Sequence, residues 1–422
     1  MPIGRLASLV RLWERARKLV MEKWRGTCRR ECNWMHKGRG SERSVWAQAI
    51  YEEAAAASDR STASVFLDLV KAFEQVALGQ VWRSGAKHRV PQRVLSLALE
   101  ACAFTRRLSY RGAVSREAHT TTAILADSGF ATDLLFVTLV EAVGEILLRH
   151  ERADTRTTLR CFMMVDDVRL TVEGQEDCVA DTLPLVAEDV VSILEGCLNM
   201  QVSRDSGAEV GKIVAQASSP RLGKWIRPRL KRLWVNIAAK VKNLGVQFAV
   251  GSKRLLGSQV AHSRLGGLRK VRRAAQLGRV VGRIAIRSIL TPSFTYGSST
   301  TSCPPRLVKQ LRVHTARTYG PMGGRSTTAR LLLEEADVSQ TLAVKTVMSW
   351  VQGVWGNLVE RDALIQALRK AWTSHIATAG IVRGVLSGGV AYLSALGQLG
   401  RAASFFDSVR ARSGDVVFLG GR

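Results

Sequence analysis

The sequence predicts an α+β protein, and three observations support this class. Residues 65–67 and 162–165 are short apolar runs bounded by polar residues, which is the pattern of buried strands. Residues 132–150 instead show the apolar periodicity of a helix. The chain has 422 residues, of which 46% are hydrophobic, so it can bury more than one core. We therefore expect a strand-rich centre between helical parts.

The other elements follow from the same periodicities and from turn signals. We predict helices at 5–24, 45–57, 132–150 and 181–198, and two more between 73 and 104, one of which starts at Pro91. We also predict a hairpin within 106–118 and a strand at 213–217. From about residue 255 the pattern becomes helical, with turns expected at Thr291-Pro292 and at 303–305 and a weakly ordered end at 413–422.

Carboxylates stand at the ends of two predicted strands. Asp68 follows the run at 65–67, and Asp166-Asp167 separates 162–165 from 168–172, which predicts a β-hairpin with the acidic pair at its tip. Half-burying several carboxylates is costly unless a cation neutralises them, and oxygen ligands without nearby His or Cys favour Mg²⁺ over zinc. Two simpler interpretations stay open: Asp68 could cap the next helix, and the acidic pair could merely form a turn.

The charge of the chain points to a polyanionic partner. Its net charge is +27, and the stretch 210–333 contains 25 Lys and Arg residues but no Asp or Glu. A solvated surface normally mixes both signs, so we interpret this stretch as a phosphate-binding surface; the alternative is a basic sequence that is merely soluble. Basic residues at helical intervals between apolar ones would follow a duplex backbone there: Arg264, Arg269, Lys270, Arg272, Arg273, Arg279, Arg283 and Arg287.

The seven cysteines are scattered and odd in number, which favours a reducing, intracellular setting. A zinc interpretation of Cys28, Cys32 and His36, at i, i+4 and i+8, lacks a fourth ligand. The sequence contains no run of 18 uninterrupted apolar residues, so we predict no membrane-spanning helix.

Several segments together resemble the reverse transcriptase domain of non-LTR (LINE-type) retrotransposons. Phe66-Leu-Asp-Leu-Val-Lys-Ala-Phe73 is similar to motif A, and Asp166-Asp167 to motif C, in the family's order and roughly a hundred residues apart. The resemblance covers about residues 1–300, and the remaining matches are informative mainly because they occur in the family's order. Residues 2–13 and 37–43 resemble the first two finger motifs, and residues 126–136 resemble motif B. Residues 241–248 resemble the motif E hairpin, and residues 291–297 resemble the end of the thumb.

The resemblance implies a right-hand polymerase fold: fingers, a palm with an antiparallel sheet, and a helical thumb. We expect partial fingers at 1–60, a palm at 61–250 with a finger insertion at about 80–125, a thumb at 251–300, and a helical C-terminal region of unknown role at 301–422. Because the chain begins inside the first finger motif and shows no endonuclease, RNase H constellation or zinc knuckle, we expect a fragment or truncated copy.

The resemblance also implies an activity and its residues. RNA-directed DNA synthesis by two-metal nucleotidyl transfer would use Mg²⁺ or Mn²⁺ held by Asp68, Asp166 and Asp167. The implied partners are an RNA template, a DNA primer and dNTPs, in the nucleus and without a membrane. The implied nucleotide-binding residues are Phe73, Leu69, Lys37, Arg39, Arg43, Ser128, Gly129 and Lys212.

Some of these positions allow other interpretations or depart from the family. Phe73 would act as a steric gate against a 2′-hydroxyl of the nucleotide sugar, but it could instead be a core residue. The basic residues Lys37, Arg39 and Arg43 could form a solvated loop, and Lys212 could be an ordinary surface charge. Ser128 stands where the family has Gln, and Met164 where it has an aromatic residue.

Two alternative functions therefore stay open beside the polymerase. One is a catalytically inactive, truncated retroelement relic that still binds nucleic acid. The other is a protein similar to group II intron maturases, in which 306–422 would bind RNA.

Overall fold

The computed structural model describes residues 8–27, 31–35, 38–105, 107, 109–117, 119–204, 213–238, 241–248, 278–300, 305–319 and 336–367, and single positions between 270 and 334. The chain forms two compact units. The first comprises Met1–Ser44 and Asp59–Val241, and the second comprises Val45–Ser58 and Lys242–Arg422. Assignment of these parts to fingers, palm and thumb stays a prediction.

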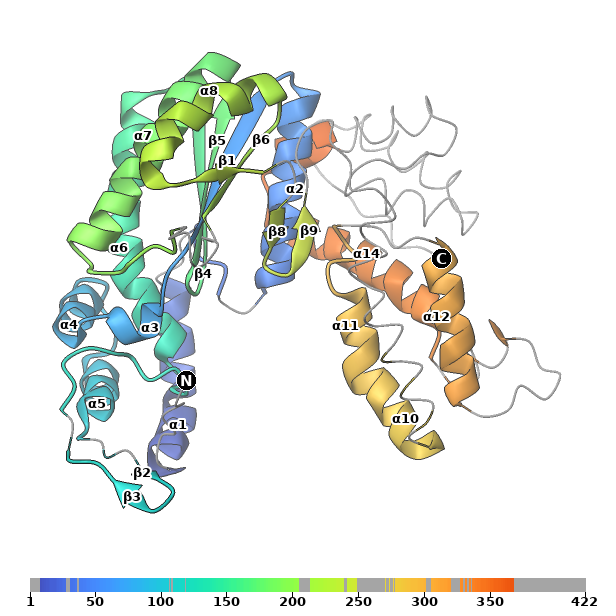
Figure 1. The fold of residues 1–422 in the computed structure, drawn as a ribbon, viewed down its shortest axis with the longest axis horizontal. Coiled ribbons are helices and arrows are strands. Elements are labelled where there is room, and N and C mark those ends of the chain that lie inside the picture. The colour runs from blue at the N-terminus through green and yellow to red at the C-terminus, as the bar shows by residue number, and fades with distance from the viewer. Residues whose placement is uncertain are drawn as a thin grey trace. The chain divides into compact units, whose positions relative to one another are not determined.

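The first unit is organised by a five-stranded sheet with the strand order β4-β5-β1-β6-β7 (Figure 1). β4, β5, β1 and β6 are antiparallel neighbours, whereas β7 joins β6 in parallel. The predicted hairpin around Asp166-Asp167 and the predicted strand at 213–217 are confirmed. The strands are β1 (Ser61–Asp68), β4 (Thr158–Met164), β5 (Asp167–Gly174), β6 (Val214–Ala217) and β7 (Asn236–Ile237).

One face of this sheet is apolar and carries the core of the first unit. Alternate residues of β5, among them Leu170 and Val172, are fully buried, as is Val65 on β1. Helices α6 (Ala131–Ala153) and α7 (Glu176–Gly196) pack on the sheet strands. Burial of each such side chain contributes about 1.5–3 kcal/mol, so this face is what holds strands and helices together.

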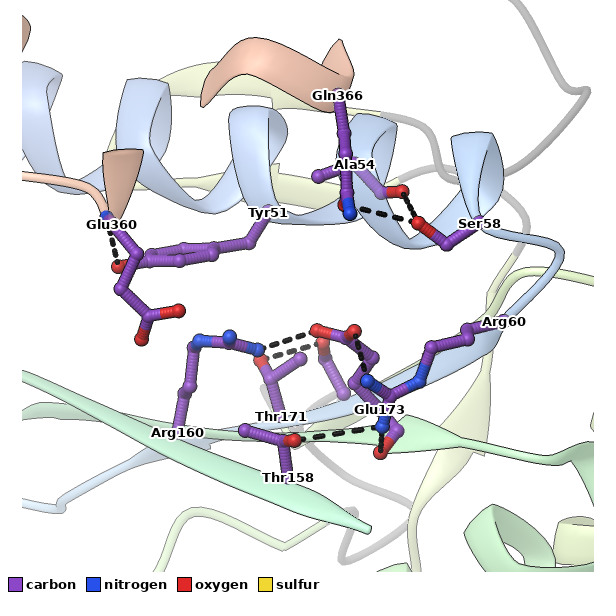
Figure 2. A network of polar contacts seen from close by, with 11 residues as sticks. Tyr51, Ala54, Ser58, Arg60, Thr158, Arg160, Thr171, Glu173, Glu360 and Gln366 are labelled. Carbon is purple, nitrogen blue, oxygen red and sulfur yellow. Dashed lines mark hydrogen bonds and ion pairs between the residues drawn. The ribbon is translucent and has the colours of Figure 1, made fainter. Parts of the chain in front are cut away.

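The other face is polar. Glu173 of β5 forms ion pairs with Arg60, at 3.2 Å, and with Arg160, at 2.5 Å, and Figure 2 shows both guanidinium groups turned toward its carboxylate. The hydroxyls of Ser64 and Thr171 are hydrogen-bonded across β1 and β5 at 2.9 Å. These buried groups therefore have partners of their own, which is the condition for burying polar side chains at low cost.

The helices around the sheet match most of the predicted ones. The helix after Pro91 and the hairpin within 106–118 are confirmed, whereas α7 begins five residues before the predicted Asp181. Its acidic first turn, Glu176-Asp177, interacts favourably with the helix dipole and explains the earlier start. The other elements of the first unit are α1 (Ser8–Thr27), α3 (Ala72–Gln75), α4 (Leu78–Lys87), α5 (Gln92–Ala103), β2 (Ser109–Tyr110), β3 (Ala113–Val114), α8 (Pro220–Leu230) and η1 (Lys231–Leu233).

The described part of the second unit is helical apart from one hairpin. A cluster around Ile286, Leu290, Phe294 and Leu342 forms its core. Helix α2 begins at Ser41, four residues before the prediction, and most of it belongs to this unit. The elements are α2 (Ser41–Ala57), β8 (Val241–Asn243), β9 (Val246–Phe248), α10 (Arg279–Ala285), η3 (Ile286–Leu290), α11 (Thr291–Thr295), α12 (Pro305–Thr318) and α14 (Val338–Trp355).

The turn predicted at Thr291-Pro292 is wrong, because the chain stays helical there. Segment η3 is a π-helix and leads directly into α11, in which Pro292 occupies the first turn. Proline is tolerated at this position because its missing N–H would have no partner in a new helix. The wider π turn accommodates the change without breaking the helical path.

The β8–β9 hairpin contacts the segment that follows α11. The Tyr296 hydroxyl donates a hydrogen bond to the Leu244 carbonyl at 2.7 Å. Gly297 has φ +71°, and a Cβ there would lie 2.8 Å from a methyl group of Val246. The predicted motif E hairpin and the predicted Tyr-Gly segment are thus packed together, and only glycine fits the junction.

Asp337 makes a testable contribution to the second unit. Its buried carboxylate accepts hydrogen bonds from the Arg312 guanidinium, at 3.0 and 2.8 Å, and from the Ser339 amide, at 2.9 Å. Burial favours the neutral form, but the Ser339 hydrogen bonds and Arg312 outweigh it, so the pKa of Asp337 lies below its ordinary value. Its stabilisation is therefore complete above the ordinary pKa of Asp and is lost as the pH falls through the lowered value.

We expect Asp337→Ala to destabilise α14 by about 1–2 kcal/mol at pH 7, and by less under acid conditions. Hydrogen exchange of peptides from α14 measures this. The exposed Asp362→Ala is the matched control in the same unit. Equal protection of α14 in both variants would contradict the role given to Asp337.

Candidate active site

The register of the sheet brings the predicted carboxylates together. Asp68, the last residue of β1, is the direct cross-strand partner of Asp167, the first residue of β5. The Leu69 amide donates a hydrogen bond to the Asp166 carbonyl at 3.2 Å. All three aspartates are partly exposed. Two segments almost a hundred residues apart in the sequence thus present their acidic side chains at one end of the sheet.

Asp68 is held by hydrogen bonds from a second segment as well. The Ser203 amide donates to the Asp68 carbonyl at 2.9 Å, and the Val70 amide donates to the Gln201 carbonyl at 2.9 Å. The next helix, α3, has Lys71 as its N-cap and no side-chain capping bond. The capping interpretation of Asp68 is therefore wrong.

The turn between β4 and β5 is strained. Met164 and Asp167 are paired, so Val165 and Asp166 alone form the turn. Val165 has φ +60°, a left-handed conformation that hairpin turns of this length usually give to Gly, Asn or Asp. For a β-branched residue this is a genuine outlier, with a cost on the order of 1–3 kcal/mol. Val165 also packs against the main core, which holds the acidic turn in place.

The donor set suits a hard divalent cation, because three carboxylates on neighbouring strand ends offer only oxygen ligands. The side chains, however, do not converge: no group of three or more His, Cys, Asp or Glu in the described part of the chain lies close enough to hold a metal ion. The backbone thus brings the three aspartates to neighbouring strand ends, and a metal site formed by them stays a prediction.

A segment before α2 runs along the edge of β4, close to the acidic turn. The Trp34 amide donates to the Met163 carbonyl at 3.1 Å, and the Met163 amide donates to the Cys32 carbonyl at 2.7 Å. The Trp34 ring stacks on Phe162 with 5.4 Å between centroids. Only Met164 and Val165 separate Met163 from Asp166, so this contact lies close to the acidic turn.

Arg39 and Arg43, the described basic residues of the predicted second finger motif, donate hydrogen bonds to backbone carbonyls. Arg39 lies 4.9 Å from the Trp34 ring centroid and donates to the Glu31 carbonyl, at 2.6 Å, and the Asn33 carbonyl, at 3.1 Å. Arg43 donates to the Gly38 carbonyl. Both side chains shape the segment before α2. The other two basic residues predicted to bind the nucleotide, Lys37 and Lys212, lie outside the described residues.

Leu69 and Phe73 differ in their accessibility. The Leu69 side chain is only 2% exposed and belongs to the core, so this residue can offer a ligand little besides its backbone. Phe73, on α3, is half-buried and packs against the same core. Phe73 thus contributes to the core, and its role as a steric gate stays a prediction.

Ser128 and Gly129 are bound by a residue that the sequence reasoning missed. Glu14 of α1 is buried and accepts hydrogen bonds from the Ser128 hydroxyl, at 2.6 Å, and the Gly129 amide, at 3.0 Å. The position of Glu14 on the same helix face as the buried Met21 was a usable signal. A carboxylate on that apolar face needs internal donors.

Helix α1 is fixed to α6 at a second point. The Arg25 guanidinium donates to both carboxylate oxygens of Asp133, at 2.7 and 2.5 Å. Burial raises the pKa of Asp133 although Arg25 opposes this effect, and the same pair raises the pKa of Arg25. The predicted motif B turn is thus bordered by two α1 side chains.

The structure describes only part of the predicted phosphate-binding helix. Lys270 and Arg273 are exposed, and Arg287 donates to the Glu334 carbonyl at 2.5 Å. Arg283 is half-buried and pairs with the Glu334 carboxylate at 2.9 Å. Three of the predicted residues, Arg264, Arg269 and Arg272, lie outside the described residues. Only the backbone of Arg279 is described.

No family model and no curated protein matches the chain. Three similar solved structures are telomerases. Apo telomerase from Candida tropicalis is 11% identical with a TM-score of 0.36, and the match covers 81% of this chain and 59% of that one. The C. tropicalis telomerase in complex with a TWJ fragment of telomeric RNA is 11% identical with a TM-score of 0.39 (82% and 56% covered), and the corresponding complex from Candida albicans is 10% identical with a TM-score of 0.38 (87% and 56% covered). The chain thus spans less than two thirds of their length. At these identities and TM-scores the similarity assigns neither a family nor an activity.

The contact between Glu14 and the turn at Ser128-Gly129 can be tested through stability. We expect Glu14→Ala to leave two donors without an acceptor and to destabilise the start of α6 by about 1–3 kcal/mol. Glu14→Gln, which keeps one acceptor, should cost less. Hydrogen exchange of peptides spanning 126–140 measures the effect, with the more exposed Glu22→Ala on the same helix as control. Unchanged exchange in Glu14→Ala would show that the contact does not hold the turn.

Proposed function

We propose that the chain is an RNA-directed DNA polymerase of the non-LTR retrotransposon type. The observation that carries the proposal is the pairing of Asp68 with Asp167, next to Asp166, at one end of an antiparallel sheet. The order and spacing of the motif A-like and motif C-like segments support it.

In this proposal Asp68, Asp166 and Asp167 rotate to hold Mg²⁺ or Mn²⁺. Bound metal ions would supply charge neutralisation at the transferred phosphate and activation of the attacking 3′-oxygen. The strained turn at Val165 orients the acidic pair, and the Trp34 contact positions the basic segment for the triphosphate. Phe73 limits the space beside the nucleotide sugar, which favours dNTPs over ribonucleotides.

The proposed partners are an RNA template, a DNA primer and dNTPs, and the proposed location is the nucleus. The net charge of +27 supports a nucleic-acid partner, because phosphate contacts draw on Lys and Arg. Within the described ranges, no helix is both long and apolar enough to cross a bilayer.

The catalytically inactive relic is the second candidate, and two observations favour it. The carboxylate side chains do not converge among the described residues. Ser128, which stands where the family has Gln, bonds to Glu14. Both features reduce what the chain can offer a nucleotide while leaving its basic surfaces intact.

Primer extension tests the carboxylates. Asp68→Asn, Asp166→Asn and Asp167→Asn should each lower the rate of dNTP incorporation on poly(rA)/oligo(dT) by at least about 10²- to 10³-fold, because each removes negative charge where metal binding requires it. Salt-sensitive binding of the duplex should hardly change. Asp59→Asn, in the exposed turn before β1, is the control.

Extension by these variants at the wild-type rate would show that the site assignment is wrong. Folded wild-type protein that binds the duplex but gives no product with Mg²⁺ or Mn²⁺ would favour the relic. Titration of Mn²⁺ into wild type and Asp68→Asn separates loss of metal binding from loss of a later step.

The steric gate predicts a change in nucleotide selectivity. We expect Phe73→Ala to lower the preference for dNTPs over ribonucleotides by about 10- to 100-fold, because removal of the ring frees space at the sugar. Single-nucleotide incorporation with each nucleotide type measures this ratio. Phe104→Ala, on a ring that is 56% exposed, is the control. A Phe73 that only packs the core would lower stability without changing the ratio.

A further inference from the structure

Helix α8 and the turn after it form a basic, aromatic surface outside the proposed active site. Leu222, Ile226 and Leu230 are fully buried and fix the inner face of the helix. Ser219 begins the helix by accepting a hydrogen bond from the Leu222 amide at 3.0 Å. The outer residues define what we call the α8 surface: Lys224, Trp225, Arg227, Lys231, Arg232 and Trp234, all exposed.

The α8 surface carries positive charge that internal acids do not balance. Arg221 and Arg229, at its border, pair with Glu176, at 3.6 Å, and Asp181, at 2.5 Å. Within the described part of the chain no ion pair forms at the four basic members of the surface. Lys224, Arg227 and Lys231 are three and four residues apart, so they share one side of the helical segment. This arrangement suits a row of phosphates.

Both tryptophans of the surface are exposed. Trp225 is 40% exposed, with the Arg221 guanidinium 4.4 Å from its ring centroid. Trp234 is 64% exposed and has φ +57°. A bulky residue in the left-handed region is an outlier that costs free energy, and exposure of the ring gains nothing for folding. This combination indicates a ring displayed for binding.

The register of the sheet places the Trp234 end of the surface toward the carboxylates. Asn236, two residues after Trp234, is aligned with Val214 of β6, which pairs with Phe66 of β1, two residues before Asp68. Neighbouring strands lie about 4.8 Å apart, so β1 and β7 are separated by about 10 Å. The surface therefore begins beside the acidic end of the sheet and follows α8 away from it.

We propose that the α8 surface binds single-stranded nucleic acid, with bases stacked on Trp234 and Trp225 and phosphates bound by the four basic residues. An exposed ring needs an unstacked base, whereas a duplex keeps its base faces covered. This binding needs neither metal nor nucleotide, so it is independent of the proposed polymerase activity. Placed beside the acidic end of the sheet, the surface suits an unpaired strand that enters or leaves that region.

Fluorescence anisotropy with labelled 12-nucleotide RNA, DNA and duplex tests this proposal on the full chain. Combined Lys224→Glu, Arg227→Glu and Lys231→Glu changes should weaken single-strand binding by at least about tenfold and reduce the salt slope by about 2, since each phosphate contact contributes about 0.7. Arg149→Glu with Arg152→Glu on α6, two exposed residues, is the charge control. The RNA and DNA arms determine which strand is preferred.

Trp234→Gly separates binding from folding. Glycine relieves the left-handed strain, so the melting temperature should not fall, whereas single-strand affinity should decrease by about 5- to 100-fold. Trp82→Ala on α4, a ring that is 37% exposed, is the control. Photocrosslinking to 5-iodouracil RNA should place adducts on Trp234 or Trp225.

Wild-type affinity in both α8 variants would overturn the proposal, as would duplex binding that depends equally on these residues. Loss of primer extension in the aspartate variants with single-strand binding intact would leave the proposal standing. Failure of the polymerase proposal is therefore distinguishable from failure of this one.

Discussion

The antiparallel pairing of β1 with β5 is the constraint on which the rest of the first unit depends. It places Asp68 opposite Asp167. It also places Phe66, two residues before Asp68, opposite Arg169, two residues after Asp167. A shift by one residue would send the buried valines and leucines of one strand to the polar face and its charged residues into the core. The packing of α6 and α7 on the apolar face therefore fixes the position of the carboxylates as well.

The candidate site combines firm backbone placement with side chains that are not gathered. Asp68 is hydrogen-bonded through its carbonyl, and Val165 is kept in a strained conformation beside Asp166 by the core. Strain of this kind persists only where surrounding packing overdetermines it.

The positive charge of the chain is divided between structural and exposed uses. Arg283 bonds within the second unit, and Arg25 ties α1 to α6 through Asp133. On α8, by contrast, basic residues stand exposed next to two accessible tryptophans. Net charge therefore predicts a polyanionic partner for the chain as a whole, and the ion pairs show which described basic residues are already engaged within the fold.

The sequence by itself determined the local features: the strand at 65–67, the acidic hairpin, the long helix α6, the helix start after Pro91 and the basic character of the chain. These depend on periodicity and turn chemistry over a few residues. Tertiary structure decided what depends on distant partners. Glu14 bonds to Ser128, Asp68 pairs with Asp167, and Trp34 stacks on Phe162, each contact joining residues about a hundred or more positions apart. No local pattern encodes such contacts, because each is set by how the sheet and helices pack.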